Sequence, residues 1–193
     1  MFNYIDNFYQ DSDLGLMVMH FLNLNFSPSY QSQDFYYGGD RMNAYPCYET
    51  PLLKQNNNPK DPYNIFKNTF ENKTNKKIYY LETFFRKVKK EEYENSASWK
   101  QHRPHLDPSK FDFAGLVYYN SNSLKDGTNL YITKNDYEPT AIIGSRFNRC
   151  VFYNTKVPHS PSVEQTVEER WTQPFFMILE EETYKKFKQN NAT

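Results

Sequence analysis

Cysteine is scarce in this chain of 193 residues: Cys47 and Cys150 are the only two, and they do not form a Cys-x-x-Cys pair. Two cysteines are too few for the disulfide framework of a small secreted domain, so a reduced intracellular compartment is the default expectation. The first residues also lack the basic n-region that is typical of a signal peptide. We therefore expect a protein of the cytoplasm, which is the host cytoplasm if the Asn-, Lys- and Tyr-rich composition reflects a viral genome.

The chain also lacks an excess of charge of either sign, because its formal net charge is zero. It therefore provides no broad electrostatic field that would recruit nucleic acid or an anionic membrane. Its most apolar stretch, residues 14–22, is far too short to span a bilayer. We expect a soluble protein whose partner is neither a membrane nor a nucleic acid, and the sequence leaves the oligomeric state open.

Aromatic residues, by contrast, are abundant, with 17 Tyr and 16 Phe. Such side chains fit a half-buried pleated surface and favour β structure. From residue 77 onward, short apolar stretches are separated by Gly, Asn and Pro turns, which is typical of an antiparallel sandwich or barrel. A jelly roll is the natural closed form for about eight such strands. The strands are expected at residues 77–89, 113–120, 128–133, 140–144, 149–154 and 170–179.

Helices are expected mainly before these strands. Apolar residues recur at helical spacing from Leu14 to Leu22, and Asp11-Ser12-Asp13 is the expected cap. A second short helix is expected from Pro62 to Asn72, after long loops rich in Tyr, Asn, Pro and Gly at residues 27–62. We expect one domain over residues 1–193, made of a helical and loop cap (1–76), a β core (77–179) and a charged helical tail (180–193).

Four polar residues that suit a metal site follow one another in the strand region. His105 and Asp107 form a His-x-Asp, His159 lies in an expected turn (residues 158–161) after the strand at 149–154, and Arg170 opens the last strand. Residues i and i+2 of an extended segment point to the same face, so His105 and Asp107 can offer a nitrogen and an oxygen to one ion. With His159 the set becomes two neutral nitrogens and one carboxylate. This is the facial triad expected for Fe(II) that keeps positions open for a co-substrate and oxygen.

Each of these residues also has a simpler interpretation. His105 alone is as well explained as a hydrogen-bonded loop histidine, and Arg170 as a surface cation at a strand start. His102 and His105 also have a His-x-x-His spacing that suits zinc, although Pro104 disfavours a helix in the residue before it.

Two neighbouring features have simple interpretations as well. The basic run from Arg86 to Lys90 is balanced by Glu91 and Glu92, and it is interpreted as a solvated strand or turn. Trp99 is a candidate for the mouth of a substrate site, and core packing explains it equally well.

The sequence resembles the Fe(II)/2-oxoglutarate-dependent oxygenases of the prolyl-hydroxylase-like branch. The resemblance covers about residues 84–178 and follows the order of the family's marks, from metal motif and core strand through a Gly-Thr turn to the distal ligand and the co-substrate anchor. The residues that carry it are His105-Leu106-Asp107, 114–120, Asp126-Gly127-Thr128, 148–152, His159 and Arg170-Trp171-Thr172. Two details depart from the family's pattern: a Gly-Gly-Thr turn is commoner, and Pro161 stands where glycine is frequent.

This resemblance implies a double-stranded β-helix (jelly roll) with an N-terminal helix and long loops packed against it. It implies Fe(II) held by His105, Asp107 and His159, with 2-oxoglutarate and O2 as co-substrates. The keto-acid end of 2-oxoglutarate would lie on the iron, and its far carboxylate would meet a cation. The residues expected at that carboxylate are Arg170, Thr172 and Tyr118, with Tyr79 and Tyr80 as further donors.

The expected reaction is hydroxylation of a C–H bond in a small molecule or a protein side chain, with succinate and CO2 as co-products. The loop-rich first third is expected to form the substrate wall. Two other functions stay open. One is a non-enzymatic, aromatic-rich jelly roll that binds a carbohydrate or a partner protein, and the other is a cupin-like metal enzyme that does not use 2-oxoglutarate.

Overall fold

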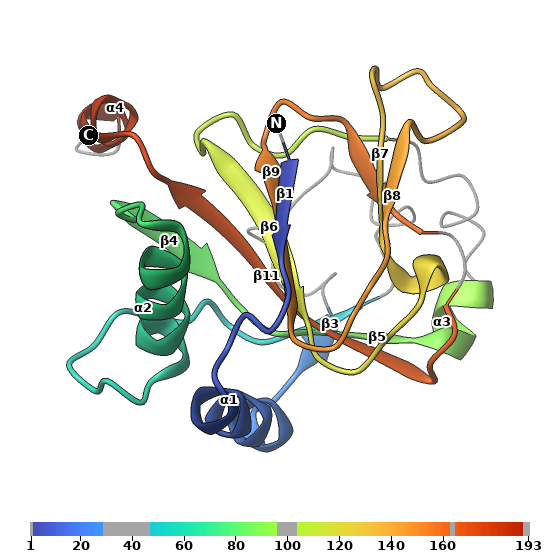
Figure 1. The fold of residues 1–193 in the computed structure, drawn as a ribbon, viewed down its shortest axis with the longest axis horizontal. Helices are drawn as coiled ribbons and strands as arrows, with labels where there is room; N and C mark the ends of the chain where they lie inside the picture. The colour runs from blue at the N-terminus through green and yellow to red at the C-terminus, as the bar shows by residue number, and fades with distance from the viewer. Residues whose placement is uncertain (1, 29–46, 96–103, 163–164, 191–193) are drawn as a thin grey trace.

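The computed structural model describes residues 2–28, 47–95, 104–162 and 165–190, and it consists mainly of two antiparallel sheets that pack face to face (Figure 1). The strands of the large sheet lie in the order β1-β9-β6-β11-β5-β3-β2, and β4 also pairs with β11. They are β1 (Phe2–Ile5), β2 (Ser27–Pro28), β3 (Tyr48–Glu49), β4 (Tyr80–Thr83), β5 (Arg86–Lys89), β6 (Phe113–Tyr118), β9 (Arg149–Asn154) and β11 (Glu169–Ile178). The small sheet has the order β10-β7-β8 and consists of β7 (Thr128–Leu130), β8 (Ala141–Ile143) and β10 (His159–Pro161).

Most strands lie where the sequence predicts them, and the main difference concerns residues 77–89. This stretch forms two strands, β4 and β5, instead of one. Both pair with β11, and the break between them lies opposite Pro174. Proline has no backbone N–H to donate to a neighbouring strand, so a continuous ladder is interrupted at this point. His159 was expected in a turn, but it begins strand β10.

Helices α1 (Asp11–Asn23) and α2 (Pro62–Thr74) lie on the side of the large sheet opposite the small sheet (Figure 1). Asp61 caps α2 by accepting from the Tyr63 N–H. The expected cap of α1 is wrong, because the helix already begins at Asp11 and its N-cap, Gln10, makes no side-chain hydrogen bond. Asp11 and Asp13 instead occupy the first turn, where negative charge is favoured by the helix dipole.

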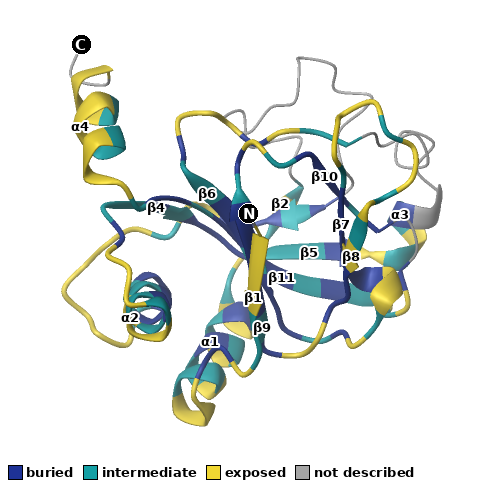
Figure 2. Cartoon of the chain, turned by 45° about the horizontal axis from the view of Figure 1, so that its top comes forward, coloured by how far each residue is buried: buried dark blue, intermediate teal, exposed yellow. Residues whose placement is uncertain are grey.

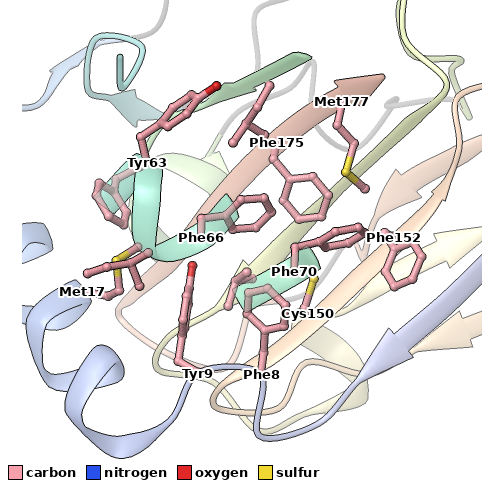
Figure 3. Packing of buried hydrophobic residues seen from close by; sticks show 14 of the residues in the cluster. Phe8, Tyr9, Met17, Tyr63, Phe66, Phe70, Cys150, Phe152, Phe175 and Met177 are labelled. Carbon is pink, nitrogen blue, oxygen red and sulfur yellow. The ribbon is translucent and has the colours of Figure 1, made fainter. Parts of the chain in front are cut away.

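An aromatic core joins these helices to the large sheet (Figure 3). Phe66 and Phe70 of α2 point at the outer face of the sheet, and the ring centroids of Phe66 and Phe175 are 4.7 Å apart. Phe8 and Phe175 are fully buried in the same cluster. Burial is therefore concentrated along the strands and on the inner sides of α1 and α2 (Figure 2).

The remaining helical elements are α3 (Lys90–Asn95), the 3-10 turn η4 (Leu124–Asp126) and α4 (Glu181–Asn190). Helix α4 stands at one corner of the molecule, away from the small sheet (Figures 1 and 2). Its Tyr184 and Phe187 pack on the rings of Tyr79 and Tyr80. Among the helices that the structure describes, none combines the length and the apolar character needed to cross a membrane.

Candidate metal centre

Two histidines from distant parts of the chain meet in an isolated antiparallel bridge. The His105 N–H donates to the His159 carbonyl at 2.9 Å, and the His159 N–H donates to the His105 carbonyl at 3.0 Å. Residues that face each other in such a bridge carry their side chains on the same face. The two imidazole centroids are accordingly 4.3 Å apart.

Asp107 joins the histidines because it lies two residues after His105 and points to the same side. Its Oδ2 is 3.3 Å from His159 Nε2, and one ligand atom from each of the three residues lies within 4.8 Å of the others. Asp107 is 8% exposed and His159 5% exposed. The structure therefore brings together the three residues that the sequence offers as metal ligands, and it directs them inward.

The hydrogen bond on the far side of His159 fixes which ring nitrogen can bind a metal. Its Nδ1 lies 3.1 Å from the Val157 carbonyl oxygen, which can only accept, so Nδ1 carries the proton. In the neutral ring, Nε2 then presents a lone pair toward the Asp107 carboxylate. Two acceptor atoms thus face each other across 3.3 Å, an arrangement that a cation between them would turn from repulsive to attractive.

Burial also sets the acidity of the carboxyl group at this centre. Desolvation raises the pKa of Asp107, while His159 in its protonated form and the positive charge of Arg86 act in the opposite direction. A cation bound here would favour the ionised carboxylate in the same way. The donor set of two imidazoles and one carboxylate fits Fe(II), and it occupies only one side of the ion.

A cavity of about 90 Å³ opens from the metal centre between the two sheets. His105, Asp107 and His159 line it together with Arg170 and Thr172, which project from the same face of β11. Arg170 is 5% exposed, so it is not a surface cation, and its Nη1 donates to the Asp126 carbonyl at 3.3 Å.

The three tyrosines expected at the co-substrate lie at different places relative to the cavity. Tyr118 is buried, and its hydroxyl lies 2.9 Å from that of Thr128, which itself lines the cavity. Tyr79 and Tyr80 donate to Glu181 and Glu82, respectively, outside the cavity. In the sequence Thr128 was part of the Gly-Thr turn and the first residue of an expected strand, but it was not a predicted site residue. Its register opposite Pro161 in β10 places it at the cavity wall.

Arg86 is a cavity residue that the sequence did not predict. The basic run that contains it was interpreted as solvated, but Arg86 lines the cavity and forms an ion pair with Glu49. The alternation along β5 explains the difference. Arg86 and Val88 face inward, whereas Lys87 lies over the rings of Phe26 and other aromatic residues on the outer face.

Some expectations for this site concern the first third of the chain and the segment before the metal motif. Among the described residues, those that line the cavity begin at Arg86, so the described part of the first third does not form its wall. Glu49 is not one of the cavity-lining residues, but it forms an ion pair with Arg86, which is one of them. His102 and Trp99 lie outside the described residues.

No protein-family model matches the chain, and no curated protein matches it. Solved structures do resemble it. The prolyl hydroxylase of Trichoplax adhaerens, solved in complex with a peptide fragment of the hypoxia inducible factor oxygen degradation domain, has a TM-score of 0.60 at 12% identity, over 100% of this chain and 87% of that one. A 2OG-Fe(II) oxygenase family protein from Burkholderia pseudomallei has a TM-score of 0.57 at 8% identity, over 93% of this chain and 86% of that one.

A third structure of this kind contains a metal ion and the co-substrate. HygX from Streptomyces hygroscopicus, solved with nickel and 2-oxoglutarate bound, has a TM-score of 0.54 at 12% identity, over 92% of this chain and 82% of that one. These likenesses show that the chain has the fold of the 2OG-Fe(II) oxygenases, prolyl hydroxylases among them, and they confirm the expected jelly roll.

Proposed function

We propose that this protein is an Fe(II)- and 2-oxoglutarate-dependent dioxygenase that hydroxylates a C–H bond. The observation that carries the proposal is the triad of His105, Asp107 and His159, two of them buried, in which Nε2 of the neutral His159 ring and the Asp107 carboxylate face each other at 3.3 Å. The fold shared with 2OG-Fe(II) oxygenases supports the same choice of metal and co-substrate.

Bound iron would supply the oxidation, in which O2, 2-oxoglutarate and R–H give R–OH, succinate and CO2. The residues of the chain have other tasks. His105, Asp107 and His159 hold the ion on one side, and the Val157 carbonyl keeps the His159 ring in the tautomer that binds it. The opposite side of the ion is then left for exchangeable ligands.

Arg170 is the proposed anchor for the far carboxylate of 2-oxoglutarate. A guanidinium keeps its charge and can bind a carboxylate through two parallel N–H groups. Thr172 lies two residues further on the same face of β11, and Thr128 lies across the cavity in the small sheet, so both can add a hydroxyl donor. Leu116, Tyr153 and Phe176 form the apolar part of the wall and limit the access of water.

An anaerobic titration tests this proposal directly. Adding Fe(II) and then 2-oxoglutarate to the metal-free protein should give a weak visible charge-transfer band, and O2 should then yield succinate. His105→Ala should abolish both signals, whereas Lys89→Gln, a loss of charge at an exposed side chain on β5, should preserve them. A His105→Ala protein that still forms succinate at the wild-type rate would remove the metal assignment.

The same titration separates the two other functions. A cupin-like metal enzyme would bind Fe(II) but ignore 2-oxoglutarate, and a non-enzymatic binding module would bind neither. The buried arginine in the cavity favours the dioxygenase, because it provides a partner for a dicarboxylate where neither alternative needs one. We propose a small molecule or a protein side chain as the primary substrate and the cytoplasm as the place of action.

A further inference from the structure

Arg86 is the second arginine of the cavity, and strand register places it beside the proposed co-substrate anchor. In the large sheet Arg86 lies directly opposite Thr172 of β11 on one side and Glu49 of β3 on the other. Residues directly opposite each other in a sheet project from the same face. Glu49, Arg86 and Thr172 therefore form one row across three strands, and both Arg86 and Thr172 line the cavity.

Glu49 holds the Arg86 guanidinium in a defined position. The Arg86 Nε and Nη2 donate to the same Glu49 oxygen at 2.7 and 2.6 Å. Glu49 is only 6% exposed. The Arg86 side chain is 27% exposed, so the pair is partly buried. Such a pair loses hydration energy and is weak evidence for stability. Its place in the wall of a cavity therefore favours a role in binding over a role in folding.

The direction of the cavity along β11 shows where the triad lies relative to the two arginines. Inward-facing residues follow one another from Arg170 toward Phe176. Phe176 is opposite Ala114, and Ala114 is opposite Tyr153. The Tyr153 ring centroid is 4.4 Å from that of His159, so the metal centre lies at the Phe176 end of the strand.

Arg86 consequently lies between the proposed far-carboxylate anchor and the metal centre. Its partner in register, Thr172, is two residues nearer to Phe176 than Arg170 is. Arg86 and Asp107 line the same cavity, whereas Arg170 donates to the Asp126 carbonyl at the other end.

We propose that Arg86 is a second carboxylate-binding residue, which holds the metal-side carboxylate of the keto-acid while Arg170 holds the far one. The proposal rests on the proposed function and adds a positioning residue to it. One arginine per carboxylate matches a dicarboxylate that spans the cavity from the triad to Arg170. Glu49 keeps the guanidinium of Arg86 oriented, and the planar fork of arginine allows it to contact a second carboxylate as well.

Two ligands distinguish the two carboxylates in a binding experiment. 2-Oxoglutarate carries both, and 2-oxopentanoate carries a methyl group in place of the far one. Dissociation constants for each are measured anaerobically with the Fe(II) protein, by calorimetry and by the visible band, so the readout does not depend on turnover.

The test variant is the double substitution Arg86→Gln/Glu49→Gln, which removes both charges and leaves no buried charge without its partner. Arg170→Gln is the comparison at the far carboxylate, and Lys89→Gln is the control on the same strand. Arg86→Lys keeps the charge but loses the fork, and it serves as the readout if the double variant does not fold. Thermal unfolding of each metal-free protein shows which variants are folded.

The expected result is that Arg86→Gln/Glu49→Gln weakens the binding of both ligands by about tenfold or more, as the loss of a charge-assisted hydrogen bond predicts. Arg86→Lys should weaken both by a smaller factor. Arg170→Gln should weaken 2-oxoglutarate by about tenfold but 2-oxopentanoate less than about threefold.

Unchanged affinity for both ligands in the double variant overturns the proposal. A loss confined to 2-oxoglutarate also overturns it, because Arg86 would then bind the far carboxylate. If the wild-type Fe(II) protein binds neither ligand, the proposed function itself fails, and this outcome is recognised before any variant is made.

Discussion

At the residue scale, the side chains of the metal centre lower the stability of the metal-free protein. Asp107 is buried, and burial raises its pKa because the ionised form loses hydration. In the neutral His159 ring the nitrogen that faces Asp107 is an acceptor, since the other ring nitrogen donates to the Val157 carbonyl. This arrangement costs the metal-free protein free energy of folding, and the protein regains that free energy when a cation binds.

Asp107→Asn should therefore stabilise the metal-free protein at neutral pH, by about 1–2 kcal/mol, while it abolishes Fe(II) binding. The amide carries no charge to desolvate, and its N–H can donate to His159 Nε2. Because the pKa of Asp107 is raised in the folded state, the wild-type protein is most stable in acid and loses stability as the pH rises through that pKa. The stability gained by Asp107→Asn should therefore shrink in acid. Urea unfolding between about pH 3 and pH 8, which covers both sides of the ordinary pKa of about 3.9, measures it.

The matched control for this substitution is Asp136→Asn. Asp136 is an exposed carboxylate whose pKa is lowered by hydrogen bonds from Thr133. Its loss should destabilise slightly and leave metal binding unchanged. Equal destabilisation by both substitutions would contradict the electrostatic account of Asp107.

The same raised pKa predicts how metal binding depends on pH. Fe(II) binds the ionised carboxylate, so binding releases a proton wherever Asp107 is protonated in the metal-free protein. As the pH falls, the apparent dissociation constant for Fe(II) should rise by about tenfold per pH unit for each proton released. This rise should begin at a higher pH than for an ordinary aspartate. Anaerobic calorimetry in two buffers of different ionisation enthalpy counts the protons. An affinity that is constant down to pH 4 would contradict a ligand set of two imidazoles and one carboxylate, all of which bind the ion in their unprotonated forms.

At the scale of elements, the central strands could be predicted from the sequence, whereas strand β10 and the inward position of Arg86 could not. The apolar stretches that form β6, β9 and β11 are buried on both faces, and their composition alone marks them. Strand β10 was missed because its three residues end in Pro161 and follow Pro158, and such a segment looks like a turn. Arg86 was missed because a basic run looks solvated unless the partner strand that covers one of its faces is known.

Gly115 shows how closely the central strands of the large sheet approach one another. A Cβ at this position would lie 2.1 Å from the Val151 carbonyl oxygen and 2.7 Å from the Phe175 ring. Gly115→Ala should therefore destabilise the protein by about 1–3 kcal/mol, because β6 must move away from β9. Gly15→Ala in α1, where a Cβ meets nothing within 4 Å, should instead stabilise it by about 0.5–1 kcal/mol. Chemical unfolding of both variants measures the difference, and a neutral Gly115→Ala would show that the strands separate freely.

At the scale of the whole molecule, strand β11 connects two layers with different tasks. Its inner face carries Arg170 and Thr172 into the cavity, and its outer face carries Phe175 into the aromatic core below α2. Between these positions the buried Gln173 accepts hydrogen bonds from Tyr9 and Tyr119, both at 2.7 Å. Helices α1 and α2 therefore support the sheet from outside, and no residue of the helices that the structure describes lines the cavity.

This division predicts that stability and ligand binding can be separated by substitution of Phe66. Phe66→Ala removes a fully buried ring between α2 and the sheet, so it should lower the free energy of unfolding by about 3–5 kcal/mol. The cavity face of β11 is held by its pairing with β5 and β6, so the 2-oxoglutarate affinity of the folded Fe(II) protein should stay within about twofold of wild type. Urea unfolding and anaerobic calorimetry at low temperature measure the two quantities. A large loss of affinity in a protein that is still folded would mean that the helical layer shapes the cavity through the sheet.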